Sequence, residues 1–432
     1  MEPPPQRLAP SGSGLLVNMP DHRHFALGLR SPQQWMSRIK RLGWGRRRLA
    51  SLRFSPSASP AGSLDRIAAI LHIGDAQGGE FHVDLWLEHL RAAGTEVLVV
   101  ARSTVLFNAL ARRSDLKAAY ARSGRDAEDL IARMRAVAAV FYTSNTGNSI
   151  HFIRAGELSH VFLGHGDSDK SASSHKYFRV YDEIWTAGQA HIDRLTAAGI
   201  GIASDRCRIV GRPSLKHLSA RRESGQSTGT FLYLPTWEGY YESQNYTSLD
   251  IGPGVVAVAA AATGKTPVVK LHPWTGKQDT ALAKAEERFR SAEGGGASPL
   301  IVARSRPASE LMGQADFLIA DVSSVVTDFL INGGPMFVYT PEERPVRFSG
   351  SRIALSEYAY VFRSAPELAA LIQQVLIEGD DWMFAARRRA LDYLIGMAET
   401  EAGAFGESVR RVTRSQSRQG EGWPQNHNPV LG

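Results

Sequence analysis

The residues best placed for chemistry lie in a short polar stretch between two apolar runs. The apolar run from Phe317 to Ala320 ends at Asp321, and Ser323 and Ser324 open a second apolar run with helical periodicity. This order predicts a buried strand that ends near Asp321 and a helix capped by one of the serines. Unpaired N–H groups and the positive end of the helix dipole would attract an anion there. The stretch is therefore a candidate phosphate site, and an ordinary strand-to-helix turn is the alternative.

Two histidines also follow predicted strands. His165 lies between glycines after the apolar run Val161 to Leu163, and His272 follows the strand Val268–Leu271. Open parallel sheets bind ligands at the carboxyl ends of their strands. An imidazole at that edge can accept a proton from an attacking hydroxyl. A structural histidine at a strand end is the alternative for each.

Further polar residues accompany these candidates. Thr236, after Pro235, would add a hydroxyl to the phosphate site, and Arg212 would add a cation. Asp167 and Asp169 are one residue apart and can share a hard cation such as Mg²⁺, although loops also favour aspartate for turns. The sequence requires no cofactor, and Mg²⁺ is the one metal that it suggests.

In this order the segments resemble the CDP-glycerol glycerophosphotransferase family, whose enzymes prime and polymerise teichoic acids and some capsules. The resemblance covers about residues 140 to 345 and rests on four short motifs: a His-Gly loop, a strand ending in Pro-Thr, a Leu-His-Pro strand end, and Asp-Val-Ser-Ser before a strand that starts with proline. It implies an α/β protein with a GT-B-like architecture. Two Rossmann-like, doubly wound parallel-sheet domains would face each other across a cleft.

The resemblance also implies roles for individual residues. His165, with Asp167 nearby, would be the base that activates the acceptor, and Asp169 and Lys170 would lie on the acceptor side. The residues implied to bind the donor's diphosphate and nucleotide are His272, Asp321, Ser323, Ser324, Thr236 and Arg212. This chain departs from the family at two places. The residues between His-Gly and Lys170 differ from the usual Thr-Pro-Leu, and Val322 replaces the tyrosine of Asp-Tyr-Ser-Ser.

The predicted function is transfer of glycerol phosphate, or a similar alditol phosphate, from a CDP-linked donor to a hydroxyl of a lipid-linked or polymeric cell-envelope glycan, with release of CMP. Phosphoryl transfer depends on positioning and charge stabilisation, so it needs no covalent nucleophile. A GT-B glycosyltransferase that uses a nucleotide sugar is the second interpretation. A membrane-docked nucleotide-binding homologue without turnover is the third, and only the altered His-Gly loop favours it.

Composition restricts the class of protein. The 432 residues predict two domains with extensions, and strand–helix alternation predicts parallel sheets covered on both faces. The single cysteine, Cys207, excludes an internal disulfide and fits a reducing cytoplasm. Neither a run of about 20 apolar residues nor a signal peptide is expected. The sequence predicts five divisions. Residues 1–63 form an arm and linker, 64–218 an acceptor-side domain and 229–380 a donor-side domain, and the terminal helices (381–413) and a polar tail (414–432) follow.

The net charge of +7 is concentrated in the N-terminal arm. Residues 1–60 hold 10 basic and 2 acidic residues, 10 − 2 = +8, and the remainder holds 40 and 41, 40 − 41 = −1. A helix is predicted from Ser31 to Phe54, with Trp35, Ile39 and Leu42 roughly on one face, before a flexible linker from Ser55 to Ser63. Such an arm is suited to an anionic membrane surface, here the inner face of the cell membrane. A merely disordered tail is the alternative, and no nucleic-acid partner is expected.

Overall fold

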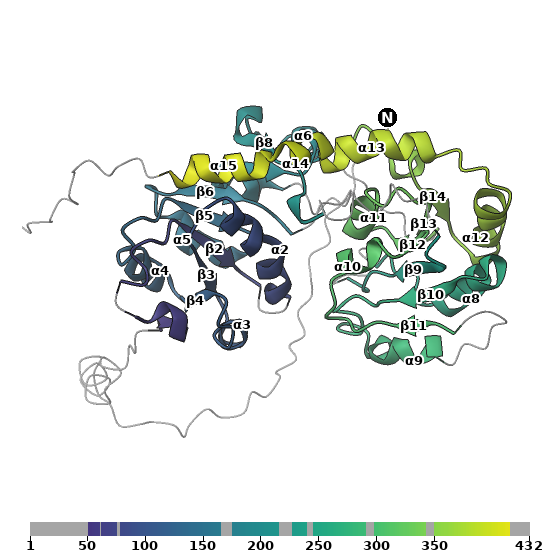
Figure 1. Cartoon of the computed structure of the whole chain (residues 1–432), viewed down its shortest axis with the longest axis horizontal. Helices are drawn as coiled ribbons and strands as arrows, with labels where there is room; N and C mark the ends of the chain where they lie inside the picture. Colours follow the sequence, from purple (N-terminus) through teal and green to yellow (C-terminus); the bar gives the residue numbers. More distant parts are fainter. Residues whose placement is uncertain are drawn as a thin grey trace, which may run out of the picture. The chain divides into compact units, whose positions relative to one another are not determined.

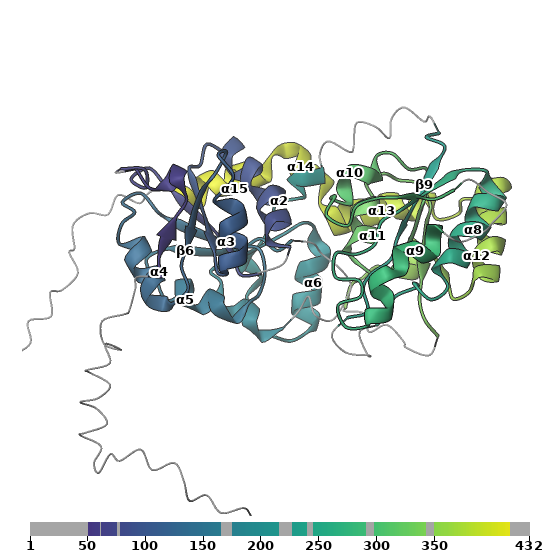
Figure 2. The ribbon, with the colours of Figure 1, turned by 90° about the horizontal axis from the view of Figure 1, so that it is seen from below.

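The protein's structure is a computed structural model that describes residues 51–60, 62–75, 78–165, 175–215, 227–239, 245–290, 298–342 and 350–414. Within these residues the chain forms one compact unit that begins at Ser51. The predicted arm helix therefore lies outside the described residues except for its last few positions. Figures 1 and 2 show the two sheets and the helices around them.

The first sheet has eight strands in the order β1-β4-β3-β2-β5-β6-β7-β8. Every neighbouring pair is parallel except β1 and β4. The strands are β1 (Arg53–Phe54), β2 (Ala69–Ile73), β3 (Val97–Ala101), β4 (Lys117–Tyr120), β5 (Ala139–Tyr142), β6 (Ser159–Phe162), β7 (Glu183–Thr186) and β8 (Cys207–Ile209). The helices are α2 (Gly79–Ala92), α3 (Thr104–Leu110), α4 (Gly124–Ile131), α5 (Ile150–Ile153) and α6 (Gln189–Ala197).

The first sheet is buried on both faces, which explains its apolar strands. Leu71 and Ile73 of β2 belong to one hydrophobic cluster with residues of α2 and α3. Ile70 belongs to the opposite cluster, with residues of α4 and α5. Because alternate residues of a strand face opposite sides, both sides must be apolar when helices cover both. The doubly wound α/β arrangement predicted from the sequence is confirmed.

The second sheet has six strands, all in parallel pairs, in the order β11-β10-β9-β12-β13-β14. The strands are β9 (Thr230–Leu234), β10 (Thr266–Val269), β11 (Leu300–Ile301), β12 (Leu318–Asp321), β13 (Met336–Tyr339) and β14 (Tyr360–Phe362). The helices are α8 (Gly252–Thr263), α9 (Ala285–Arg290), α10 (Ser309–Met312), α11 (Ser324–Phe329) and α12 (Ala365–Ile372), and a π-helical turn, Gln373–Ile377, extends α12.

The C-terminal helices pack against both sheets. They are α13 (Phe384–Ile395), α14 (Met397–Ala402) and α15 (Ala404–Thr413), which appear in yellow-green to yellow in Figure 1. Leu394 of α13 packs in a core cluster of the second sheet, and Phe405 of α15 packs in a core cluster of the first. Gly396 joins α13 to α14 with a φ of +63°, and a Cβ there would lie 2.2 Å from the carbonyl oxygen of Ala187. The segment from 381 to 413 therefore packs against the cores of both sheets.

The expected flexible linker from Ser55 to Ser63 is instead packed in part against the first sheet. Arg53 and Phe54 pair with β4 as an antiparallel edge strand, so the predicted arm helix does not extend to Phe54. The backbone N–H of Ser55 donates to the carbonyl of Ala118 at 2.9 Å, and Ala58 is 3% exposed. The described domain thus begins about ten residues earlier than composition suggested, because proline and serine can occur in an ordered turn as well as in a linker.

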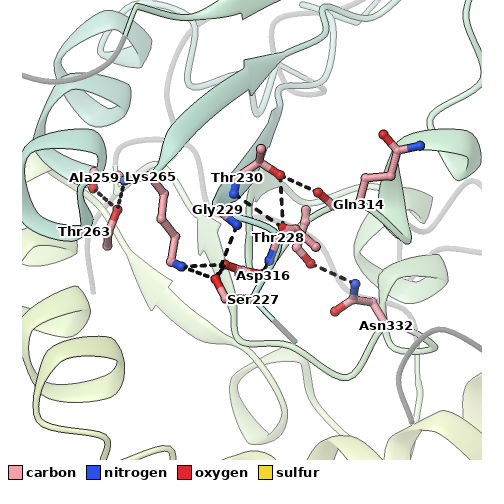
Figure 3. Close-up of polar contacts among 11 residues, drawn as sticks. Ser227, Thr228, Gly229, Thr230, Ala259, Thr263, Lys265, Gln314, Asp316 and Asn332 are labelled. Atoms are coloured by element: carbon pink, nitrogen blue, oxygen red, sulfur yellow. Dashed lines mark hydrogen bonds and ion pairs between the residues drawn. The ribbon is translucent and has the colours of Figure 1, made fainter. Parts of the chain in front are cut away.

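A charged cluster joins three segments at the amino-terminal edge of the second sheet. Asp316 accepts hydrogen bonds from Ser227, Thr228 and Lys265 (Figure 3). Ser227 and Thr228 precede β9, Lys265 precedes β10, and Asp316 itself precedes β12. Burial alone would raise the pKa of Asp316, but these bonds outweigh it and lower that pKa to about 2. The cluster lies at the start of the strands and therefore fixes the sheet rather than a ligand at its opposite edge.

Candidate active site

A pocket of about 190 Å³ lies at the carboxyl ends of β9, β10 and β12. These three strands are adjacent in the second sheet, so the loops that follow them meet at one edge. The polar residues that line the pocket are Thr236, Lys270, His272, Ser323 and Ser324, and the apolar ones are Leu234, Pro235, Ala308 and Val325. Four of the six residues predicted for the donor site therefore lie together. No acidic side chain is among the described residues that line the pocket.

His272 is oriented by its own loop. Its Nδ1 accepts the backbone N–H of Trp274 at 3.1 Å, so in the neutral ring the proton lies on Nε2. The indole of Trp237 stacks on the imidazole, with ring centroids 6.1 Å apart and planes 19° apart. Buried Glu238 accepts the backbone N–H groups of three residues in the same loop, Gly276, Gln278 and Asp279. The loop thus presents His272 as a hydrogen-bond donor, which suits a phosphate oxygen.

The two serines lie at the start of α11, but neither forms the predicted cap. Ser323 is the N-cap residue by position, yet its hydroxyl donates to the carbonyl of Asp321 at 3.2 Å and makes no cap bond. The hydroxyl of Ser324 has no hydrogen-bond partner among the described residues. The helix has six residues and ends at Phe329. The serines can therefore serve a ligand through their hydroxyls, and so short a helix adds only a small dipole.

Asp321 lies behind the pocket instead of lining it. Its side chain is fully buried, and its carboxylate accepts the backbone N–H of Thr236 at 2.7 Å and that of Ser248 at 3.1 Å. The hydroxyl of neighbouring Thr247 donates to the carbonyl of Thr236 at 2.8 Å. A carboxylate directed at backbone N–H groups repels an anion and cannot hold it. The structure therefore places Asp321 as a positioning residue for Thr236.

Lys270 is the pocket residue to which the sequence assigned no role. Its side chain is 8% exposed, and the hydrogen bond from its Nζ to the carbonyl of Leu271 is long, at 3.5 Å. No carboxylate among the described residues forms an ion pair with it. Burial lowers the pKa of Lys270 to about 8. The alternation of side chains along a strand could have predicted that Lys270 lines the pocket, because residues 270 and 272 of a continuing strand lie on the same side.

Replacement of Lys270 by methionine is expected to raise the free energy of unfolding near neutral pH by about 1–3 kcal/mol. The folded-state pKa, about 8, lies below the ordinary value of 10.5. The buried ammonium therefore costs stability at low and neutral pH, and this cost disappears as pH rises from about 8 to 10.5, because the folded protein loses its proton first. Thermal unfolding of both proteins near neutral pH and about two units higher measures the difference. A difference that does not shrink at the higher pH contradicts the assignment.

Arg212 does not line this pocket. Its guanidinium donates to both carboxylate oxygens of Asp328 in α11, at 2.9 and 3.0 Å, and is 6% exposed. Its backbone N–H donates to the hydroxyl of Thr400 in α14 at 2.8 Å. Gly211 before it has a φ of +73°, and a Cβ there would lie 2.1 Å from that same hydroxyl. Arg212 is therefore engaged in packing between α11 and α14.

His165 lies at the carboxyl edge of the first sheet and is exposed. Its Nδ1 donates to the carbonyl of Thr143 at 2.8 Å, so Nε2 carries the free lone pair of the neutral ring. The ring of His82 stacks on it, with centroids 4.3 Å apart and planes 22° apart. Burial and the neighbouring His165 lower the pKa of His82 to about 2, so His82 stays neutral. This arrangement gives His165 the tautomer that a general base requires.

The backbone before His165 is fixed as well. Gly164 has a φ of +70°, and its carbonyl accepts the indole N–H of Trp86 at 2.8 Å. The predicted partners Asp167, Asp169 and Lys170 lie outside the described residues. Among the residues that are described, no group of three or more His, Cys, Asp or Glu side chains could hold a metal ion. In the same part of the chain, every helix is too short or too polar to cross a membrane.

Comparisons with known proteins bear on the fold and on residues 211–374. Residues 211–374 match the family described as CDP-Glycerol:Poly(glycerophosphate) glycerophosphotransferase, and this range contains the whole pocket. The wall teichoic acid polymerase TagF has a similar structure, with a TM-score of 0.52 and 11% identity over 82% of this chain and 91% of that chain. A histidine-to-asparagine variant of TagF soaked with CDPG gives a TM-score of 0.53 and 12% identity over 88% and 97%. Among curated protein sequences there was no significant match.

At such low identity the likeness to TagF establishes the fold alone, and that fold is GT-B-like. The family match is independent of it and falls on the residues that build the pocket. Residues 211–374 are thus similar to the CDP-glycerol:poly(glycerophosphate) glycerophosphotransferase family of transferases.

Proposed function

We propose that the protein transfers glycerol phosphate, or a similar alditol phosphate, from a CDP-linked donor to a hydroxyl of a lipid-linked or polymeric cell-envelope glycan of the teichoic-acid or capsule type. The observation that carries this proposal is the composition of the pocket. It gathers one lysine, one oriented imidazole and three hydroxyls at a sheet edge, and the described residues that line it include no carboxylate. These groups suit an anionic diphosphate. The family match of residues 211–374 supports the same chemistry.

In the proposed reaction, the acceptor hydroxyl attacks the β-phosphorus of the donor. Nε2 of His165 takes the proton of that hydroxyl, the new O–P bond forms, and the bond from the β-phosphorus to the bridging oxygen breaks. CMP leaves with the bridging oxygen. His272, Thr236, Ser323 and Ser324 would hold the diphosphate, and no covalent enzyme intermediate is needed.

Replacement of His272 by alanine is expected to weaken CDP binding about tenfold or more, because a hydrogen bond to a charged group contributes about 1.5–3 kcal/mol. CMP should be affected less, since it presents one phosphate. Calorimetric titration with CDP and with CMP measures both. His272→Gln is the matched control, because its amide N–H can restore part of the bond. Unchanged CDP affinity in the alanine variant would remove His272 from the donor site.

The function itself is tested by incubation with CDP-glycerol and a lipid-linked saccharide, followed by mass analysis of the product. Addition of glycerol-phosphate units with stoichiometric CMP release is the expected result. Release of UDP or GDP from nucleotide sugars, with sugar addition, would instead support a GT-B glycosyltransferase. Nucleotide binding without any product would support the inactive homologue.

We also propose that the N-terminal arm holds the protein at the cytoplasmic face of the membrane, where lipid-linked acceptors lie. Residues 1–60 carry a net charge of +8, and each basic residue near an anionic surface contributes about 1 kcal/mol. Full-length protein is expected to sediment with anionic vesicles at moderate salt, and protein that starts at Ser51 is not. The shortened protein starts at Ser51 so that it retains Arg53 to Ala58, which pack against the first sheet. Equal sedimentation of the two proteins would exclude the arm as the anchor, and neutral vesicles provide the control.

A further inference from the structure

Lys270 differs from two of the buried arginines among the described residues, Arg212 and Arg387. Arg212 pairs with Asp328, and Arg387 pairs with Asp381 and donates to the carbonyl of Gly333. Lys270 is similarly buried, at 8% exposure, but no carboxylate of the described residues forms an ion pair with it. Its hydrogen bond to the carbonyl of Leu271 spans 3.5 Å, the limit for such a bond. A buried charge without a counter-charge is costly, so its presence points to a ligand that supplies the missing anion.

Among the described residues, the lining of the pocket around Lys270 contains hydrogen-bond donors and no carboxylate. Asp321 lies at the end of a neighbouring strand, and its two carboxylate oxygens already accept backbone N–H groups from Thr236 and Ser248. The hydroxyls of Thr236 and Ser324 line the pocket with Lys270, and each can donate one hydrogen bond to an oxygen. A pocket of about 190 Å³ with this lining fits phosphate oxygens and leaves the lysine as its source of positive charge.

We propose that Lys270 is the cation that binds the donor's diphosphate directly. This inference rests on the proposed function for the identity of the donor. It predicts that affinity depends on the charge at position 270 and not on its hydrocarbon stem. Lys270→Met, which keeps an unbranched stem, is therefore expected to lose CDP affinity by about tenfold to a hundredfold. Lys270→Arg is expected to retain most of it, because the guanidinium keeps the charge.

Proton uptake gives a second signature that packing alone would not produce. Because burial lowers the pKa of Lys270 to about 8, part of the free protein carries a neutral amine in mildly alkaline solution. A bound diphosphate favours the ammonium, so binding takes up a proton, and affinity falls as pH rises above about 8. The titratable groups on the described strand ends and loops around Lys270 include His272, Asp321, Tyr233 and Glu238, and Glu238 accepts backbone N–H groups of the loop after His272. Burial raises the pKa of Tyr233, so it does not titrate in this range.

The experiment is calorimetric titration of CDP near pH 8.5, at about half a unit above the Lys270 pKa, in two buffers that differ in ionisation enthalpy. Wild-type protein is expected to take up a substantial fraction of a proton. Lys270→Met should bind weakly without this uptake, and Lys270→Arg should bind without it, because arginine stays charged. Wild-type affinity in Lys270→Met, or uptake that persists in it, would overturn the inference.

Two controls separate this inference from the proposed function. Thermal unfolding of Lys270→Met must show a folded protein, and increased stability is expected from removal of the buried charge. Inorganic pyrophosphate, titrated in parallel, probes the anion site without a nucleotide. If wild-type protein binds pyrophosphate through Lys270 but does not bind CDP, the cation site stands and the CDP-linked donor is wrong. If wild-type protein, Lys270→Met and Lys270→Arg all bind CDP equally well, the CDP-linked donor stands and the role of Lys270 is wrong.

Discussion

His165→Ala is expected to lower the rate of transfer about 10²–10⁴-fold, the usual effect of losing a general base. The physical reason is the orientation of the ring. The carbonyl of Thr143 accepts from Nδ1, so the exposed ring presents an unprotonated Nε2 to an acceptor hydroxyl. Buried, neutral His82 stacks behind it and does not compete for the proton. CDP affinity should stay within a few-fold of the wild-type value, because the proposed diphosphate ligands lie on the second sheet.

Initial rates of CMP release from a CDP-linked donor, measured with acceptor present, decide this prediction. His89→Ala is a matched control, because His89 lies in the last turn of α2 in the same domain, outside the proposed site. A His165→Ala protein that turns over at a near wild-type rate would exclude His165 from the mechanism. A large loss of CDP affinity in that variant would instead indicate a role in donor binding.

Asp321→Ala is expected to lower the free energy of unfolding by about 2–5 kcal/mol. The variant leaves the backbone N–H groups of Thr236 and Ser248 buried without their acceptor, and each unsatisfied group costs about 1–3 kcal/mol. Denaturant unfolding followed by fluorescence provides the measurement. Asp321→Asn is the informative companion, because its one carbonyl oxygen can accept one of the two bonds while its amide N–H opposes the other. It should lie between alanine and wild type.

The same pair of variants distinguishes positioning from direct contact with the donor. If Asp321 positions Thr236, loss of stability and loss of CDP affinity should occur together. A variant with wild-type stability and much weaker CDP binding would show that the carboxylate acts on the donor directly, as the sequence suggested.

Periodicity and turn residues were sufficient to predict the two parallel sheets. Strand β12 ends at Asp321, as the apolar run from Phe317 to Ala320 predicted, because a strand covered on both faces must be apolar along its length. Such runs could not predict the short strands β1 and β4. In β4, Lys117 and two alanines carry little strand signal. These strands form because neighbouring segments, distant in sequence, offer them hydrogen-bond partners.

The sequence by itself determined which residues occupy the carboxyl edges of the sheets: His165 on the first, and Thr236, His272, Ser323 and Ser324 on the second. Only the tertiary structure decided what each polar group at that edge does. Asp321 turns toward the N–H of Ser248, the carbonyl of Thr143 fixes the tautomer of His165, and Lys270 lines the pocket with no carboxylate beside it among the described lining residues. The physical reason is that position along a strand follows from local periodicity. The partner of a hydrogen bond, and therefore the charge and direction of a side chain, is set by loops from elsewhere in the chain.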